Sequence, residues 1–123
     1  MNIIILNKSK QPIYEQIYEQ IAAQILNGKL EANSPLPSIR AIARELGVSI
    51  VTVKQAWELL ERGELIYTRM GKGCFVSEHV ENQLDDKKFA LAMDKLKKDI
   101  PYYKNLNITL EELIELIKDV YQK

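Results

Sequence analysis

The chain has 123 residues, 46% of them hydrophobic, which is enough for one well-filled core and at most a small second unit. Its 17 Lys and Arg balance 17 Asp and Glu, so the overall charge gives no sign of a nucleic-acid partner. No apolar run approaches the roughly 20 residues that span a bilayer. The amino-terminal residues lack the features of a signal peptide, and the single cysteine, Cys74, permits no internal disulfide. We therefore expect a cytoplasmic protein with no membrane partner.

The first predicted helix runs from Pro12 to about Asn27. Pro12 suits the first turn, and Gly28 follows the last turn, where a left-handed residue commonly closes a helix. Residues 29–36 include Asn, Ser and Pro and are expected to form a connection. The helix is predicted from apolar residues at helical spacing, namely Ile13, Ile17, Ile21, Ala22, Ile25 and Leu26.

Two short helices are predicted next, on either side of Gly47. Pro37 opens the first of them, and Gly47 ends it. Ser49 follows the short turn and can cap the second helix by accepting a hydrogen bond from a free backbone N–H. This arrangement is typical of a helix-turn-helix. Trp57 lies on the apolar stripe of the second helix, so we expect it to fill the core rather than to stack on a base.

A β-hairpin is predicted after these helices. Residues 65–68 and 74–76 are rich in β-branched and aromatic side chains, and the glycine-containing stretch 70–73 separates them. In a domain with a helix-turn-helix, such a hairpin is the wing.

The last third of the chain is expected to form a separate tail. Residues 81–86 are polar and acidic and mark a boundary, so we divide the chain into a domain of residues 1–80 and a tail of residues 81–123. One helix should end at Pro101, and another should begin at Thr109, which forms a capping-box pattern with Glu112. The predicted fold is mainly α with a small β-hairpin: a winged helix-turn-helix followed by a two-helix dimerisation tail.

Positive charge gathers locally on the predicted helix-turn-helix and wing. Between Pro37 and Lys54, and in the glycine-rich stretch of the hairpin, five cationic side chains accompany one carboxylate. A neutral protein with charge sorted in this way can still bind phosphate. We expect the helix after Gly47 to enter the DNA major groove and the wing to reach the adjacent minor groove. The candidate DNA-binding residues are Ser38, Arg40, Arg44, Ser49, Ile50, Val51, Thr52, Lys54, Gln55, Arg69, Gly71, Lys72 and Gly73.

Residues 10–77 contain an ordered set of short motifs, namely Leu36-Pro37-Ser38-Ile39-Arg40, Ala43–Leu46, Val48-Ser49, Thr52-Val53, Ala56, Leu60, Gly63, Ile66 and Gly71–Val76. In this combination, residues 10–77 resemble the amino-terminal domain of GntR-family regulators. The short tail resembles that of the YtrA-type subfamily. The resemblance implies a homodimer that represses transcription at a palindromic operator, often beside transporter genes. Many members have an arginine where this chain has Ile50, so an apolar contact with a thymine methyl group is the alternative at that position.

The apolar faces of the tail exceed what two helices can cover against each other. A second copy of the chain is the simplest partner, because a two-fold interface uses the same patch twice. The alternative is that the tail folds back on the winged domain. The candidate dimerisation residues are Phe89, Met93, Leu96, Leu110, Leu113, Ile114, Ile117 and Tyr121.

Other functions receive less support from the sequence. A winged-helix adaptor that binds protein and no DNA is the main alternative. An enzyme is not expected, because the chain has one histidine, His79, and no catalytic set of Ser, His and Asp or of Cys and His. We expect no metal and no cofactor, and no residue identifies a small-molecule effector.

Overall fold

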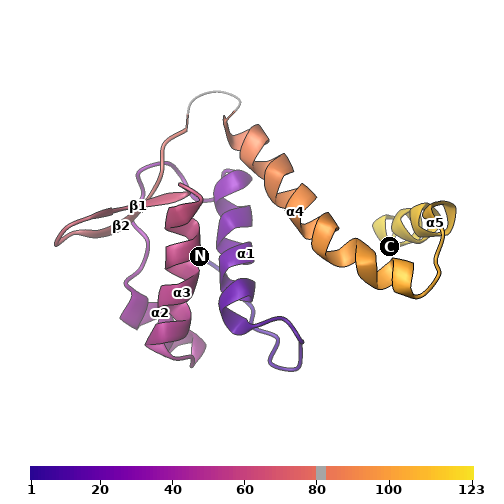
Figure 1. Cartoon of the computed structure of the whole chain (residues 1–123). Coiled ribbons are helices and arrows are strands. Elements are labelled where there is room, and N and C mark those ends of the chain that lie inside the picture. Colours follow the sequence, from indigo (N-terminus) through magenta and orange to yellow (C-terminus); the bar gives the residue numbers. More distant parts are fainter. Residues whose placement is uncertain (80–82) are drawn as a thin grey trace. The chain divides into compact units, whose positions relative to one another are not determined.

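The computed structural model describes residues 1–79 and 83–123. The chain separates into two compact units, Met1–Leu84 and Asp85–Lys123, each described by itself below (Figure 1). The boundary expected after residue 80 falls at residues 80–82, outside the described residues. No helix in the described ranges is long and apolar enough to cross a membrane.

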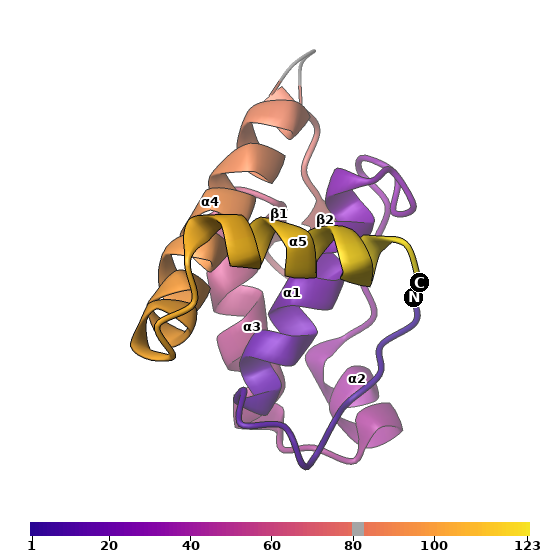
Figure 2. The same cartoon turned by 90° about the vertical axis from the view of Figure 1, so that its right-hand side faces the viewer.

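Three helices form the core of the first unit. They are α1 (Ile13–Leu26), α2 (Ile39–Leu46) and α3 (Ile50–Arg62), and α3 packs against both of the others (Figures 1 and 2). Ile17 and Ile21 of α1 are fully buried together with residues of α3, and Trp57 is only 4% exposed. The expectation that Trp57 fills the core is therefore confirmed. Most of the apolar residues at helical spacing on α1 and α3 are buried, as this spacing predicted.

The turn between α2 and α3 is built as the sequence indicates. Ser38 and Ser49 cap the two helices, each accepting a backbone N–H from three residues ahead, at 3.1 Å. Gly47 closes α2 with φ 68°, in the left-handed region that residues with a Cβ avoid. These local signals fix the start of α3 relative to the end of α2, and the start of α3 is where the candidate site lies.

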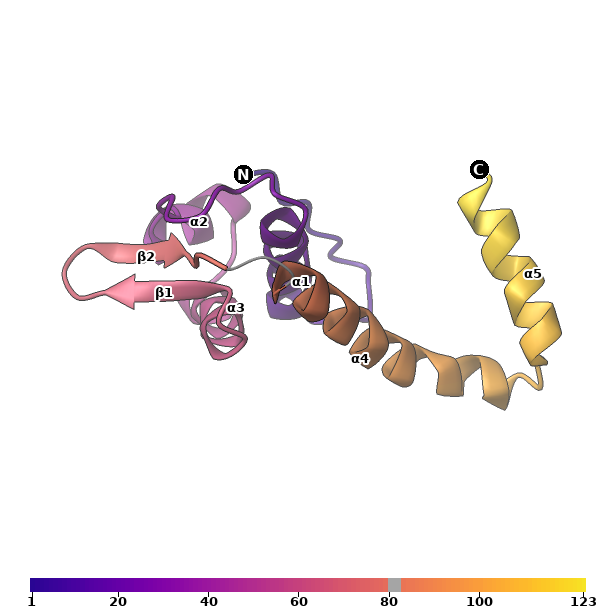
Figure 3. The ribbon, with the colours of Figure 1, turned by 90° about the horizontal axis from the view of Figure 1, so that it is seen from above.

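The hairpin consists of β1 (Ile66–Arg69) and β2 (Gly73–Val76), which pair antiparallel. Each strand extends one residue closer to the tip than predicted, and Leu65 is buried beside β1 rather than part of it. Ile66 and Val76 pair at the base and are both buried, which anchors the hairpin in the core. The other end projects away from the three helices (Figure 3).

A short extended segment before α2 pairs with the free edge of β2. The N–H of Leu36 donates to the carbonyl of Cys74 at 2.9 Å, and the N–H of Asn33 donates to the carbonyl of Val76 at 2.7 Å. The N–H of Val76 in turn donates to the carbonyl of Ser34 at 2.9 Å. The prediction of a simple connection over residues 29–36 missed this pairing, which covers an edge that would otherwise be open.

The amino-terminal residues are held along α1 by glutamine side chains. Gln20 bonds both the N–H and the carbonyl of Ile4, at 2.8 and 2.6 Å, and Gln16 bonds both groups of Leu6, at 2.8 and 3.1 Å. Gln24 donates to the carbonyl of Asn2 at 2.7 Å. Glutamines four residues apart lie on one face of a helix, so they satisfy alternate residues of an extended chain as a neighbouring strand would.

The long helix α4 (Gln83–Asn105) corrects one prediction, because it continues through Pro101. Proline removes the hydrogen bond to the carbonyl of Lys97, but both residues are exposed, so water can satisfy that carbonyl. The helix ends instead at Asn105, and Asn107, two residues later, has φ 61°. The N–H of Asn107 donates to the carbonyl of Lys104, and that of Ile108 donates to the carbonyl of Tyr103, the pattern of a Schellman motif.

The last helix, α5 (Leu110–Tyr121), begins with the predicted capping box. Thr109 accepts the N–H of Glu112 at 3.1 Å, and the Glu112 carboxylate accepts the N–H of Thr109 at 2.9 Å. These bonds to Thr109 hold the pKa of Glu112 below its ordinary value of 4.5. Its contribution to α5 is therefore present above the ordinary carboxyl pKa and is lost as the pH falls through the lowered one.

Replacing Thr109 by alanine should destabilise α5 without affecting the first unit. Loss of an N-cap costs about 1 kcal/mol, so opening of the first turn should become about fivefold more frequent. Hydrogen exchange of the Leu113 and Ile114 amides measures this opening, and the amides of α1 provide the internal control. Equal exchange of α5 in both proteins would show that the box does not stabilise the helix.

Candidate nucleic-acid interface

The exposed face of α3 begins at its first turn. Ile50 and Val51 are 43% and 65% exposed, and Lys54 and Gln55, one turn later, are exposed as well. Thr52 is half-buried. The opposite face is buried and consists of Val53, Ala56, Trp57 and Leu60. Helix α3 therefore presents one continuous face, the geometry that a helix in the major groove requires.

Ser49 and Thr52 order the start of this face. Besides capping the helix, the Ser49 hydroxyl lies 2.8 Å from the Thr52 hydroxyl. One of the two hydroxyl groups donates to the other, so the second hydrogen of the pair is left to reach an outside acceptor. The helix N-terminus adds a partial positive charge at the same place. Together these groups suit an incoming phosphate oxygen.

Arg40 and Arg44 lie one turn apart on α2 and are both exposed. Residues four apart share a face of a helix, while Ile42 and Ala43 of α2 are buried. Helix α2 in turn packs against α3. Both arginines therefore lie on the exposed face of a helix that packs against α3.

The tip of the hairpin is a tight turn. The N–H of Lys72 donates to the carbonyl of Arg69 at 2.9 Å, and Gly71 has φ 75° in the third position of the turn. This combination is typical of a type II turn, which requires glycine there. The side chains of Arg69 and Lys72 are exposed, and so are Gly71 and Gly73. Met70, which was absent from the predicted set, occupies the corner of the same turn.

Five cations lie on α2, α3 and the hairpin, and no carboxylate of the described residues neutralises them. Over residues 1–79 and 83–123, none of the five forms an ion pair with a carboxylate. Helices α2 and α3 and the hairpin lie on the same side of α1 (Figures 1 and 3). The five cations, which we call the basic surface, are Arg40, Arg44, Lys54, Arg69 and Lys72.

The tail presents a second, apolar surface. Phe89, Met93 and Leu96 follow one face of α4 and are between 49% and 66% exposed. On α5, Leu113 is only 9% exposed and is thus already covered, whereas the other candidate dimerisation residues, Leu110, Ile114, Ile117 and Tyr121, are exposed. The sequence analysis missed further exposed apolar residues of the tail, namely Tyr102, Leu106, Leu116 and Val120.

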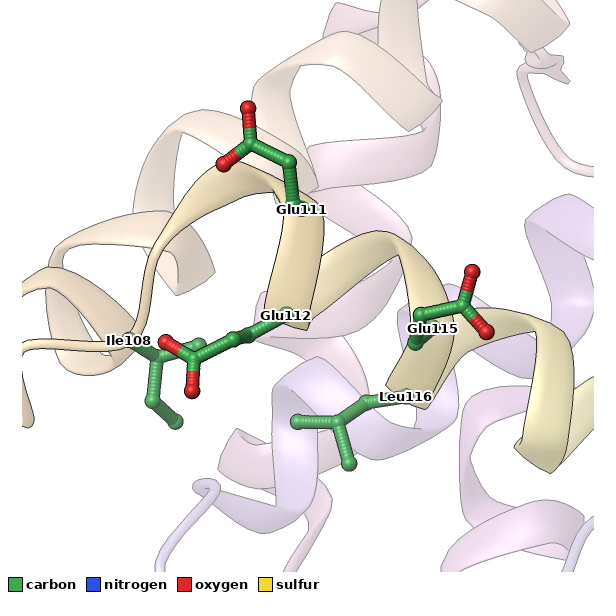
Figure 4. Close-up of a pocket in the computed structure, with 5 residues that line it drawn as sticks. All are labelled: Ile108, Glu111, Glu112, Glu115 and Leu116. Atoms are coloured by element: carbon green, nitrogen blue, oxygen red, sulfur yellow. The ribbon is translucent and has the colours of Figure 1, made fainter.

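An open hollow of about 530 Å³ lies at the start of α5 (Figure 4). Two of its three carboxylates already serve the helix, because Glu112 belongs to the capping box and Glu115 pairs with Lys118 at 3.7 Å. Ile108 and Leu116 supply the apolar part of the lining. The hollow offers little polar chemistry for a metabolite, and it adds apolar surface to the tail.

Comparisons with known proteins agree with this geometry. The sequence profile of the bacterial regulatory proteins of the gntR family matches residues 13–76. The transcriptional repressor YtrA of Bacillus subtilis (strain 168) is 34% identical over 113 residues, which are 92% of this chain and 87% of that protein.

Solved structures agree as well. The crystal structure of a transcriptional antiterminator from Listeria monocytogenes EGD-e matches with a TM-score of 0.76 and 36% identity, covering 100% of this chain and 91% of that one. The DNA-binding domain of AraR bound to operator ORX1 matches with a TM-score of 0.55 and 26% identity, over 63% and 96% of the two chains.

These matches confirm the predicted fold, a winged helix-turn-helix with a helical region after it, and the expected absence of enzymatic activity. They favour a DNA-binding regulator over the adaptor alternative, which they do not support. The chain belongs to the GntR family of bacterial regulatory proteins and is a DNA-binding transcription regulator.

Proposed function

We propose that the chain is a homodimeric transcription repressor that binds a palindromic operator in the cytoplasm. The observations that carry the proposal are the exposed first turn of α3 and five cations, on α2, α3 and the hairpin, that no carboxylate of the described residues neutralises. The relative YtrA, which aligns over nearly the whole chain, is a repressor, and this supports the same role here. The GntR resemblance further favours genes for transporters as targets.

In this proposal each part of the basic surface has its own role on the duplex. Ser38, Thr52 and Lys54 bind phosphate oxygens, which position the protein but carry no sequence information. Gln55 and the arginines of α2 reach base edges, where a bidentate contact discriminates by about 1–3 kcal/mol. Ile50 contacts a thymine methyl group in the major groove. The glycines of the hairpin allow its backbone to approach the adjacent minor groove.

The tail joins two such surfaces. Exposed apolar faces on α4 and α5 need a partner, and a second copy supplies the same faces through a two-fold axis. A dimer sets two α3 helices about one helical turn, roughly 34 Å, apart, which matches the two half-sites of a palindrome. A single α3 covers only one half-site, so the dimer supplies most of the specific affinity.

Selection of duplexes from a randomised pool tests the proposal. We expect the full chain to enrich a palindrome with half-sites one turn apart and to sediment as a dimer. Affinity for the enriched duplex should fall linearly with the logarithm of the salt concentration, because phosphate binding releases counterions. A chain that enriches no sequence, does not shift random duplex and is not retained by heparin would contradict DNA binding. A monomer at micromolar concentration would contradict the dimer alone.

A further inference from the structure

Met70 is the most exposed large hydrophobic side chain among the described residues. It is 98% exposed at the corner of the hairpin turn, between Arg69 and Gly71. The hydrogen bond from Lys72 to Arg69 closes the turn, so the backbone beneath Met70 is held in place. A side chain exposed to this extent buries almost no apolar area and therefore contributes little to folding stability. The methionine is therefore available to contact a partner outside the chain.

The charges around Met70 indicate a polyanion as that partner. Arg69 and Lys72 flank it, and the hairpin from Ile66 to Val76 contains no Asp or Glu. Both cations lie within a residue or two of the methionine and have no carboxylate partner in the described part of the chain. The hairpin and α3 lie on the same side of α1, so one DNA duplex could contact both elements. A lipid or protein surface at the tip would leave the exposed face of α3 without a role.

The composition of the tip suits the minor groove. That groove is about 6 Å wide, and proteins that enter it combine cationic side chains with apolar wedges such as methionine. Gly71 and Gly73 keep the tip narrow on one side of Met70. In the minor groove, A·T pairs present only acceptors, while a G·C pair adds the 2-amino group of guanine. An apolar thioether cannot accept a good hydrogen bond from that amino group and would displace its water.

From these observations we infer that Met70 is a specificity-determining residue that inserts into the minor groove beside each half-site and selects A·T pairs against the guanine 2-amino group. The inference rests on the proposed function, because it requires that the basic surface binds duplex DNA. It assigns sequence readout to a side chain of the wing, in addition to α3.

Inosine substitution tests the inference directly. Inosine·cytosine presents guanine's pattern in the major groove but lacks the 2-amino group in the minor groove. The probe is the fluorescein-labelled duplex enriched by the full-length chain, with each A·T pair beside the half-sites replaced in turn by G·C or by I·C. At the pair under the wing we expect G·C to weaken binding about tenfold and I·C to restore most of the affinity.

Variants of Met70 assign the effect to this side chain. In Met70→Ala and Met70→Gln the difference between G·C and I·C should fall to within about twofold, because the apolar contact is gone. Met70→Leu should keep the difference in affinity between the G·C and I·C duplexes, because leucine is also apolar. Ile4→Ala, at another exposed apolar residue of the same unit, serves as the matched control and should behave as the wild type. Circular dichroism of each variant verifies the fold.

The outcomes separate the inference from the proposed function. If the wild type binds the enriched duplex but never distinguishes G·C from I·C, the inference is overturned and the proposed function stands. The same holds if Met70→Ala discriminates as strongly as the wild type. If the wild type enriches and binds no duplex at all, the proposed function fails and the inference fails with it.

Discussion

Alanine at Arg40 or at Arg44 is expected to weaken binding of the enriched duplex by about 1–3 kcal/mol, or about 5- to 150-fold. Both side chains are exposed on one face of α2, the helix that packs against α3, and neither is neutralised within the described residues. Fluorescence anisotropy at several salt concentrations separates two kinds of contact. Removing an arginine that contacts a base should reduce discrimination between DNA sequences. Removing an arginine that binds phosphate should instead reduce the slope of affinity against salt concentration by about one unit.

Glu45 provides the matched control for these arginines. It is exposed on the same helix, next to Arg44 in sequence, and carries the opposite charge. Glu45→Ala should leave binding unchanged or strengthen it slightly, because a nearby negative charge repels phosphate. If both arginine variants bind like the wild type, α2 does not contact the duplex and the site assignment is wrong.

Aspartate in place of Ile117 should convert the protein into a monomer. Ile117 is exposed in the single chain, on the face of α5 that we assign to the dimer. A carboxylate buried in that interface without a partner would cost several kcal/mol, which should be enough to dissociate the dimer. Since the two α3 helices then bind independently, affinity for the palindrome should fall about 10²- to 10⁴-fold. Sedimentation and anisotropy report the two effects.

Asp119→Asn is the control for the tail. Asp119 lies two residues further along α5 and is exposed, and it pairs with Lys123 at 3.6 Å. Losing this exposed pair should change neither the mass nor the affinity, because surface ion pairs contribute little. A dimer that persists in Ile117→Asp would move the interface elsewhere. A monomeric wild type would favour the alternative in which the tail packs on its own winged domain.

The elements that follow a strong period or a terminal signal were predictable from the sequence. The stripes of α1 and α3, and the caps Ser38, Ser49 and Thr109, place the helix boundaries within a residue or two. These signals are local: they depend on residues within one turn of each other. The hairpin was found for the same reason, with each strand one residue short at the tip.

Elements that depend on distant partners were not predictable. The extended segment around Pro35 looks like a loop, because its strand character comes only from the edge of β2. The amino-terminal residues are ordered by glutamine side chains of α1, a pattern visible only once the helix exists. Pro101 was expected to end α4, but a solvated carbonyl tolerates it, and the local signal that ends the helix is Asn107.

The sequence predicted most residues of the candidate site but only part of the exposed surface that they form. Helical spacing placed Lys54 and Gln55 outward and Trp57 inward, and the structure agrees. The prominence of Met70 was missed, since its exposure follows from the turn geometry that Gly71 permits. Apolar residues in tight turns flanked by cations are the sequence signal that would have identified it.

Hydrogen exchange of the full-length chain, with and without the enriched duplex, tests most directly whether this face of the molecule binds DNA. We expect slower exchange at the starts of α2 and α3 and at residues 69–73 of the hairpin, with α1 unchanged. Slowing confined to α1 or α5, or no change at saturating duplex, would contradict the account.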